Sequence, residues 1–295
     1  MDMNVLKYMA FAKTVEYGSF TRAAEILHYS QSGISRMIAD LEQEWGFSLL
    51  ERSRGGVRLT AEGEQLLPYA QKLCRAYDKL QMQVDDIRGL QRGLIRIGAI
   101  ASTAIHWVPN IIRAFQKDFP GINYELLLGD YEEVVQWLME GRVDGAFTIL
   151  PAGEGLESIP LEADELVAIL PPEHPLAAQE SVALESLCHD PFLMLEIQTG
   201  KHSTIYDLFR SRQLSPRVLL TTWEDFAITT MVENGLGVSV LPRLILRRTP
   251  YHIAIRPLTE PAYRHLGFVL RSRDNASLAM KRFLQYLDAR NDVQA

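Results

Sequence analysis

The sequence predicts a mixed α/β protein in which a helical N-terminal domain with a β-hairpin is joined by one long helix to a two-lobed α/β domain. Three observations predict this order. Apolar residues recur at helical spacing over residues 5–45, a heptad pattern runs over residues 66–87, and short apolar runs alternate with helical stretches from residue 93 onward. With 295 residues, 47% of them hydrophobic, the chain is long enough to bury more than one core.

Two helices are predicted at the start of the chain. Apolar residues between positions 5 and 15 recur at helical spacing, and Gly18 is a natural stop because glycine accepts a left-handed backbone. Ser19 can then cap a short second helix through its side-chain oxygen. Ala23 and Ala24 in this second helix are small enough to let another helix approach closely.

A third helix is predicted from Ser30, a suitable N-cap, to Gly46. Its apolar residues recur every three to four positions and predict one inward face, formed by Ile34, Ile38, Leu41 and Trp45. The opposite face of its first two turns carries short or forked hydrogen-bonding groups, which are Gln31, Ser32, Ser35 and Arg36. Such side chains reach base edges and phosphates in the major groove of DNA, so this is a candidate recognition helix.

A β-hairpin with a glycine turn is predicted next. Residues 47–52 and 57–59 flank the turn, and three arginines crowd it, namely Arg52, Arg54 and Arg58. A basic hairpin beside a recognition helix is suited to binding the phosphates of the DNA backbone. Residues 1–60 are therefore predicted to form a winged helix-turn-helix. The alternative is a small helical subdomain with a solvated charged hairpin.

The overall charge argues against indiscriminate binding to nucleic acid. The net charge is −7, and residues 1–60 hold seven basic and seven acidic side chains. Because affinity for phosphates comes from clustered lysine and arginine, only local clustering can support DNA binding here.

A long linker helix is predicted over residues 61–92. Thr60 can cap it, no strong stop appears before Gly89, and Pro68 inside it is expected to kink it or to remove a hydrogen bond. Its apolar residues alternate by four and three as in a heptad seam, and they are Leu66, Ala70, Leu73, Tyr77, Leu80, Val84 and Ile87. A helix of about 45 Å cannot hide such a stripe against a short domain. We therefore expect a homodimer.

Residues 93–295 are predicted to form the α/β domain. Strand-like runs alternate with helical stretches, which favours a parallel, doubly wound sheet, and the later runs supply enough strands for a second, similar lobe. Ligands of such sheets bind beyond the carboxyl ends of the strands, often against helix N-termini. Five polar residues are expected at such places: Ser102, Thr103, Thr148, Gln198 and Thr199. Each could instead be an ordinary cap or turn residue. For Trp223 a buried packing role is favoured over closure on a ligand ring.

The segment 18–63, GSFTRAAEILHYSQSGISRMIADLEQEWGFSLLERSRGGVRLTAEG, resembles the N-terminal signature of the LysR-type transcriptional regulators. One departure is Gly33, where the family more often has alanine or another helix former, and which costs roughly 1 kcal/mol inside a helix. The C-terminal part resembles the effector domain of the same family through GLIRIGA, FPGINYELLLGD, LMEGRVDGA, LVAILPPEHPLA, ENGLGVSVLP and FLQYL. The resemblance spans nearly the whole chain.

This resemblance implies a domain like a periplasmic solute-binding protein. Lobe one would comprise residues 93–164 and 267–295 and lobe two residues 165–266, with two crossover strands at the hinge. It also implies a homotetramer, autorepression and contact with RNA polymerase. The five polar residues named above together favour a small polar effector between the lobes. The dimer would read double-stranded DNA at an inverted-repeat operator.

Two rival functions stay open on the residues alone. An enzyme could be built on the two-lobed domain, although no GxSxG, HExxH or Walker loop is present. The other rival is an architectural DNA-binding protein, which would have no effector.

Cys74 and Cys188 have no metal-ligand spacing, so neither a metal nor another cofactor is expected. No apolar run approaches the roughly 18 residues of a membrane span, and a cytoplasmic protein is expected.

Overall fold

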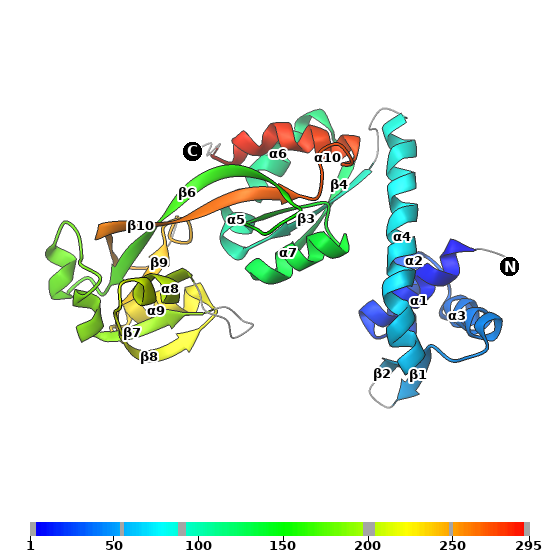
Figure 1. Cartoon of the computed structure of the whole chain (residues 1–295), viewed down its shortest axis with the longest axis horizontal. Coiled ribbons are helices and arrows are strands. Elements are labelled where there is room, and N and C mark those ends of the chain that lie inside the picture. The colour runs from blue at the N-terminus through cyan, green and yellow to red at the C-terminus, as the bar shows by residue number, and fades with distance from the viewer. Residues whose placement is uncertain (1–3, 54–55, 88–92, 197–203, 248–249, 292–295) are drawn as a thin grey trace. The chain divides into compact units, whose positions relative to one another are not determined.

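The computed structural model describes residues 4–53, 56–87, 93–196, 204–247 and 250–291. The chain divides into two units, an N-terminal unit of Met1–Gly89 and a C-terminal unit of Leu90–Ala295 (Figure 1). Among the described residues, no helix combines the length and the apolar character that a bilayer crossing demands.

The N-terminal unit begins with three helices, α1 (Val5–Tyr17), α2 (Phe20–Leu27) and α3 (Gln31–Trp45). Side-chain oxygens cap each start: Asn4 accepts from the backbone N–H of Leu6, Ser19 from that of Arg22, and Ser30 from that of Gly33. Gly18 and Gly46 end α1 and α3 in the left-handed conformation.

The three helices enclose one core. Phe11, Ile34 and Leu41 have no exposed surface, and Ala23 of α2 is also fully buried, which lets α2 pack closely on its neighbours. The predicted inward stripe of α3 therefore faces this core. Trp45 is its least buried member and packs against the edge of the cluster.

A hairpin follows, made of β1 (Leu50–Ser53) and β2 (Gly56–Leu59) in antiparallel pairing. β1 starts three residues later than the predicted 47–52, whereas β2 starts one residue before the predicted 57–59. The Glu42 carboxylate of α3 accepts from the backbone N–H groups of Leu49 and Leu50 at 2.6 and 3.1 Å, and so ties the hairpin to α3.

Helix α4 (Ala61–Ile87) begins where Thr60 caps it, with the Thr60 hydroxyl accepting from the N–H of Gly63 at 3.0 Å. The helix continues through Pro68. The heptad stripe has two different surroundings: Leu66 and Ala70 pack into the core of α1–α3, whereas Tyr77 and Leu80 are exposed. The expectation that this domain cannot cover the stripe is therefore wrong for Leu66 and Ala70, and it holds for Tyr77 and Leu80.

The C-terminal unit is built on a six-stranded sheet in the order β4-β3-β5-β10-β6-β9. The strands are β3 (Gly93–Ala99), β4 (Ile122–Leu128), β5 (Gly145–Ile149), β6 (Glu157–Leu170), β9 (Ser239–Pro242) and β10 (Ala254–Leu270). Only β4, β3 and β5 are mutually parallel; β10 runs antiparallel to both β5 and β6, and β6 antiparallel to β9. The sheet is therefore mixed rather than purely parallel.

Helices cover both faces of the parallel part of the sheet. α5 (Ala101–His106) and α6 (Val108–Asp118) connect β3 to β4, and α7 (Tyr131–Glu140) connects β4 to β5 on the other side of β3. Because such crossovers are right-handed, this reversal places α6 and α7 on opposite faces, as Figure 1 shows. α10 (Leu278–Phe283) and the 3₁₀ helix η3 (Leu284–Asn291) complete this part, whose core includes Trp107, Phe115, Phe147 and Phe268.

A second core, which includes Phe192, Phe209 and Ile228, lies around the other end of β6 and β10. Its elements are η1 (Pro175–Ala178), η2 (Ser186–His189), β7 (Pro191–Leu195), α8 (Thr204–Ser211), β8 (Arg217–Thr222) and α9 (Asp225–Glu233), with β7 and β8 paired in parallel. We call the parts built around these two cores the first and second lobes. The paired β6 and β10 contribute to both (Figure 1).

Candidate functional site

The outer face of α3 presents polar side chains at the start of the helix. Gln31, Ser32 and Arg36 are exposed, and Ser35 is half-buried. The Ser30 hydroxyl caps the helix and also lies 3.1 Å from the Ser32 hydroxyl. Because the buried stripe fixes the rotation of α3, these groups form a polar surface on a rigid helix, which suits a major groove.

Gly33 lies directly under this cap. A Cβ atom at position 33 would approach the Ser30 hydroxyl oxygen to 3.2 Å, which is tighter than an ordinary contact. The helix-propensity cost of glycine is therefore partly offset, since alanine at this position would press on the N-cap.

The structure describes the side chain of one of the three arginines predicted on the hairpin. Arg58 is exposed on β2, and Glu51 lies opposite it on β1 as its cross-strand partner. Arg54 and the side chain of Arg52 lie outside the described residues. Tyr29, which is 43% exposed in the turn before α3, is a further candidate for DNA contact that the sequence analysis left without a role.

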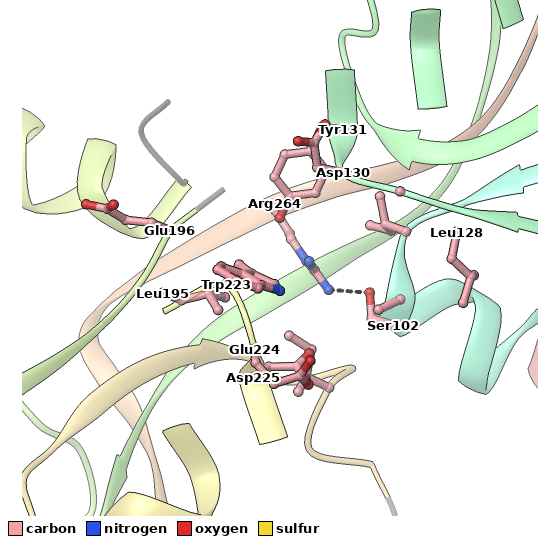
Figure 2. A pocket seen from close by; sticks show the side chains of 14 residues that line it. Ser102, Leu128, Asp130, Tyr131, Leu195, Glu196, Trp223, Glu224, Asp225 and Arg264 are labelled. Carbon is pink, nitrogen blue, oxygen red and sulfur yellow. Dashed lines mark hydrogen bonds between the residues drawn. The ribbon is translucent and has the colours of Figure 1, made fainter. Parts of the chain in front are cut away.

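The C-terminal unit contains a cavity of about 290 Å³, which we call the first cavity. It lies at the carboxyl ends of β3 and β4, and it is closed by residues of the second lobe and of β10 (Figure 2). The carboxyl ends of the strands are the usual ligand position in open α/β sheets. Its lining includes Ser102, Asp130, Tyr131, Trp223, Asp225 and Arg264.

A buried ion pair forms one wall of the first cavity. Arg264 of β10 and Asp164 of β6 are 3% and 2% exposed, and the guanidinium Nε donates to Asp164 Oδ2 at 2.8 Å. Arg264 Nη2 also donates to the Ser102 hydroxyl at 2.9 Å, and the backbone N–H of Leu244 donates to Asp164 Oδ1 at 2.8 Å. The network therefore links the two long strands to the start of α5.

The predicted effector residues have different positions. Ser102 lines the first cavity, whereas Thr103 is fully buried, donates its hydroxyl proton to the carbonyl of Ile100, and does not line the cavity. Thr148 lines a second cavity of about 510 Å³, which shares Tyr131 with the first. Gln198 and Thr199 lie outside the described residues.

The first cavity also holds acidic groups that the sequence analysis missed. Asp130 precedes α7, and Glu224 and Asp225 lie at the start of α9. Burial, and to a lesser extent the Glu224 carboxylate, raise the pKa of Asp225 above its usual value, although Arg264 acts against this shift.

Trp223 departs from its prediction. The indole is 63% exposed and lines the first cavity, so the favoured packing role is wrong. Position 223 directly follows β8 and precedes α9, and such strand-to-helix connections often carry ligand-facing side chains. This position in the chain was the sequence signal that could have predicted a place beside the cavity.

Family models and known proteins match both units of the chain. The model described as "Bacterial regulatory helix-turn-helix protein, lysR family" matches residues 7–64, and the model "LysR substrate binding domain" matches residues 88–292. The probable HTH-type transcriptional regulator LrrA of Synechococcus elongatus is 34% identical over 90% of this chain and 90% of its own length. The uncharacterized HTH-type transcriptional regulator YvbU of Bacillus subtilis is 28% identical over 96% of this chain and 97% of its own length.

A solved structure agrees with the fold. Full-length CbnR in complex with its target DNA superposes with a TM-score of 0.72 at 21% identity, covering 98% of this chain and 100% of that chain. The predicted fold class is confirmed by these matches. Because the two family models together cover most of the sequence, the chain belongs to the LysR family and is a DNA-binding transcriptional regulator with an effector-binding domain.

Proposed function

We propose that this regulator binds an inverted-repeat operator as a homodimer and changes its action when a small effector enters the first cavity. The observation that carries the proposal is the polar face of α3, where Gln31, Ser32 and Arg36 are exposed on a helix held by a buried stripe. In the complex of the relative CbnR the partner is double-stranded DNA, which supports the same partner here.

The basic hairpin is the proposed contact to the DNA backbone. In this proposal Arg52, Arg54 and Arg58 hold phosphates while α3 enters the groove. Ser35 and Arg36 then lie one turn further along α3 than Gln31 and Ser32, and these four residues read the bases.

Helix α4 is the proposed dimer contact. Tyr77 and Leu80 are 38% and 59% exposed on the stripe that buries Leu66 and Ala70 nearer the start of the helix. Pairing with the same stripe of a second copy would remove this apolar surface from water. A tetramer and a contact with RNA polymerase belong to the same proposal through the family resemblance alone.

The dimer contact has a direct test in Leu80→Lys. A lysine at the seam removes apolar burial from both copies, so we expect the dissociation constant of the dimer to rise by about tenfold or more. Analytical ultracentrifugation measures this change, with Lys72→Ala, an exposed residue of the same helix away from the stripe, as the control. An unchanged dimer in Leu80→Lys contradicts pairing through this stripe.

The effector is proposed to act by shifting the balance between two arrangements of the lobes. The first cavity takes residues from both lobes and from β10, so a ligand that fits one arrangement better stabilises it. The effect on DNA is a changed spacing or angle between the two DNA-binding units of the dimer.

The whole proposal is tested by footprinting the full-length protein on the DNA beside its own gene. We expect protection of an inverted repeat whose half-sites are one or more helical turns apart, and a changed footprint with an effector. Binding of a metabolite without turnover separates a sensor from an enzyme. An intact footprint with no thermal shift from a broad metabolite library would favour an architectural protein. Absence of any protected site would overturn the proposal.

A further inference from the structure

The first cavity is bordered by carboxylates on two sides. Asp130 lies at the start of α7, and Glu224 and Asp225 lie across Arg264 from it in Figure 2, whereas Glu196 points away. Arg264 is the only basic side chain among the described residues of this lining, and Asp164 already balances its charge. These residues therefore present an excess of negative charge to a ligand.

One of these carboxylates has a buried oxygen without a partner. Asp130 Oδ1 accepts from the backbone N–H groups of Glu132 and Glu133 at 2.9 Å each, as the cap of α7. Asp130 Oδ2 is buried and has no hydrogen-bond partner among the described residues. A carboxylate oxygen can only accept, so what this position lacks is a hydrogen-bond donor.

A second unpartnered oxygen belongs to the neighbouring second cavity. Thr148 is 1% exposed, and its hydroxyl makes no hydrogen bond within the described part of the chain. Tyr131 lines both cavities, so the two residues with unpartnered oxygens line neighbouring cavities. Buried polar atoms are normally satisfied, and two exceptions beside cavities point to a ligand.

We infer that the effector carries a protonated amino group, which binds in the first cavity between Asp130 and Asp225, with Thr148 available to a second polar group. This inference rests on the proposed function, in which the cavity holds the effector. An ammonium group supplies three donors and a positive charge, and so satisfies Asp130 Oδ2 and offsets the surplus of carboxylates. A bound cation also relieves the cost of ionising Asp225, whose pKa burial raises.

An anionic effector fits these residues less well. The hydroxyl of Ser102 already accepts from Arg264, and the guanidinium is shared with Asp164. A carboxylate ligand would also approach Asp130, Glu224 and Asp225, and like charges repel most strongly in a partly buried site.

The test compares ligands that share a carbon skeleton and differ in charge. Full-length protein without DNA is titrated by calorimetry and by thermal shift with 1,4-diaminobutane, 1,4-butanediol and butanedioate, and with the propane to hexane members of each series. We expect binding in the order amine, alcohol, carboxylate. If carboxylates bind as well as the amines, or if no amine binds better than its alcohol, the inference is overturned.

Two variants locate the bound ammonium group. Asp130→Asn keeps an acceptor for the cap of α7 and places an NH2 donor at the unpartnered position, and Asp225→Asn removes the facing charge. Each is expected to weaken amine binding by about tenfold or more. Glu140→Gln, at the far end of α7 and outside the lining, is the matched control and should leave the amine affinity within about twofold. Unchanged affinity in both aspartate variants would also overturn the inference.

The footprint without added ligand separates this inference from the proposed function. If the protein protects an operator but binds butanedioate more tightly than the diamine, only the inference of an ammonium group is rejected. If it binds the diamine but protects no DNA, the proposed binding to an operator is rejected instead.

Discussion

Replacing Arg36 with alanine is expected to weaken operator binding by about 1–3 kcal/mol, which is about 5- to 150-fold in the dissociation constant. Arg36 is exposed in the second turn of α3, where a guanidinium can pair with a guanine edge or a phosphate. Its removal leaves the buried stripe of Ile34, Ile38 and Leu41 intact. Gel-shift titration at fixed salt measures the loss, and ultracentrifugation checks that the dimer persists.

Arg217→Ala is the matched control for this experiment. It removes the same charge from an exposed position on β8 in the C-terminal unit. We expect its operator affinity to stay close to that of the unaltered protein, since Arg217 is not among the proposed DNA contacts. If Arg36→Ala keeps full affinity and an unchanged footprint, α3 does not read the operator as proposed.

Replacing Arg264 with methionine is expected to lower the free energy of unfolding of the C-terminal unit by about 3–5 kcal/mol. The change leaves the Asp164 carboxylate 2% exposed without its ion partner, and it also removes the donor to Ser102. Urea unfolding followed by circular dichroism measures the loss. An effect below about 1 kcal/mol would mean that this network adds little to stability.

Two further variants separate burial from charge. Arg243→Met breaks an ion pair with Glu165, the residue next to Asp164, but the Arg243 side chain is 48% exposed, so a loss of about 0–1 kcal/mol is expected. The pair Asp164→Asn with Arg264→Met removes both charges and keeps an oxygen for the N–H of Leu244. It is expected to recover part of the loss, because no buried charge is then left unpaired.

Local rules predicted the N-terminal unit well. The caps Ser19, Ser30 and Thr60 accept the backbone hydrogen bonds expected of them, and Gly18 and Gly46 adopt the left-handed conformation. These features depend on residues within four positions of one another, so the local sequence is enough to predict them. The ends of the two hairpin strands differ from the prediction because strand ends depend on pairing partners, which local patterns do not specify.

The C-terminal site could not be predicted in the same way. Arg264 lies 100 residues from Asp164 and 162 from Ser102 in sequence, and no spacing rule connects them. Residues 254–270 form one strand although Pro257 and Pro261, residues that rarely occur inside strands, lie within it. A shift in register between Pro257 and Ala262 accommodates these prolines.

The two lobes are joined by paired strands rather than by a loop. β6 and β10 are paired from Ala254–Leu170 in one lobe to Leu270–Glu157 in the other, with register shifts between Pro257 and Ala262 and between Leu266 and Gly267. Rotation of the lobes about a single residue would break hydrogen bonds between β6 and β10. Relative motion of the lobes therefore has to be distributed along both strands as a change of twist. We therefore propose that an effector in the first cavity acts by changing the twist of this pair of strands rather than by bending it at one point.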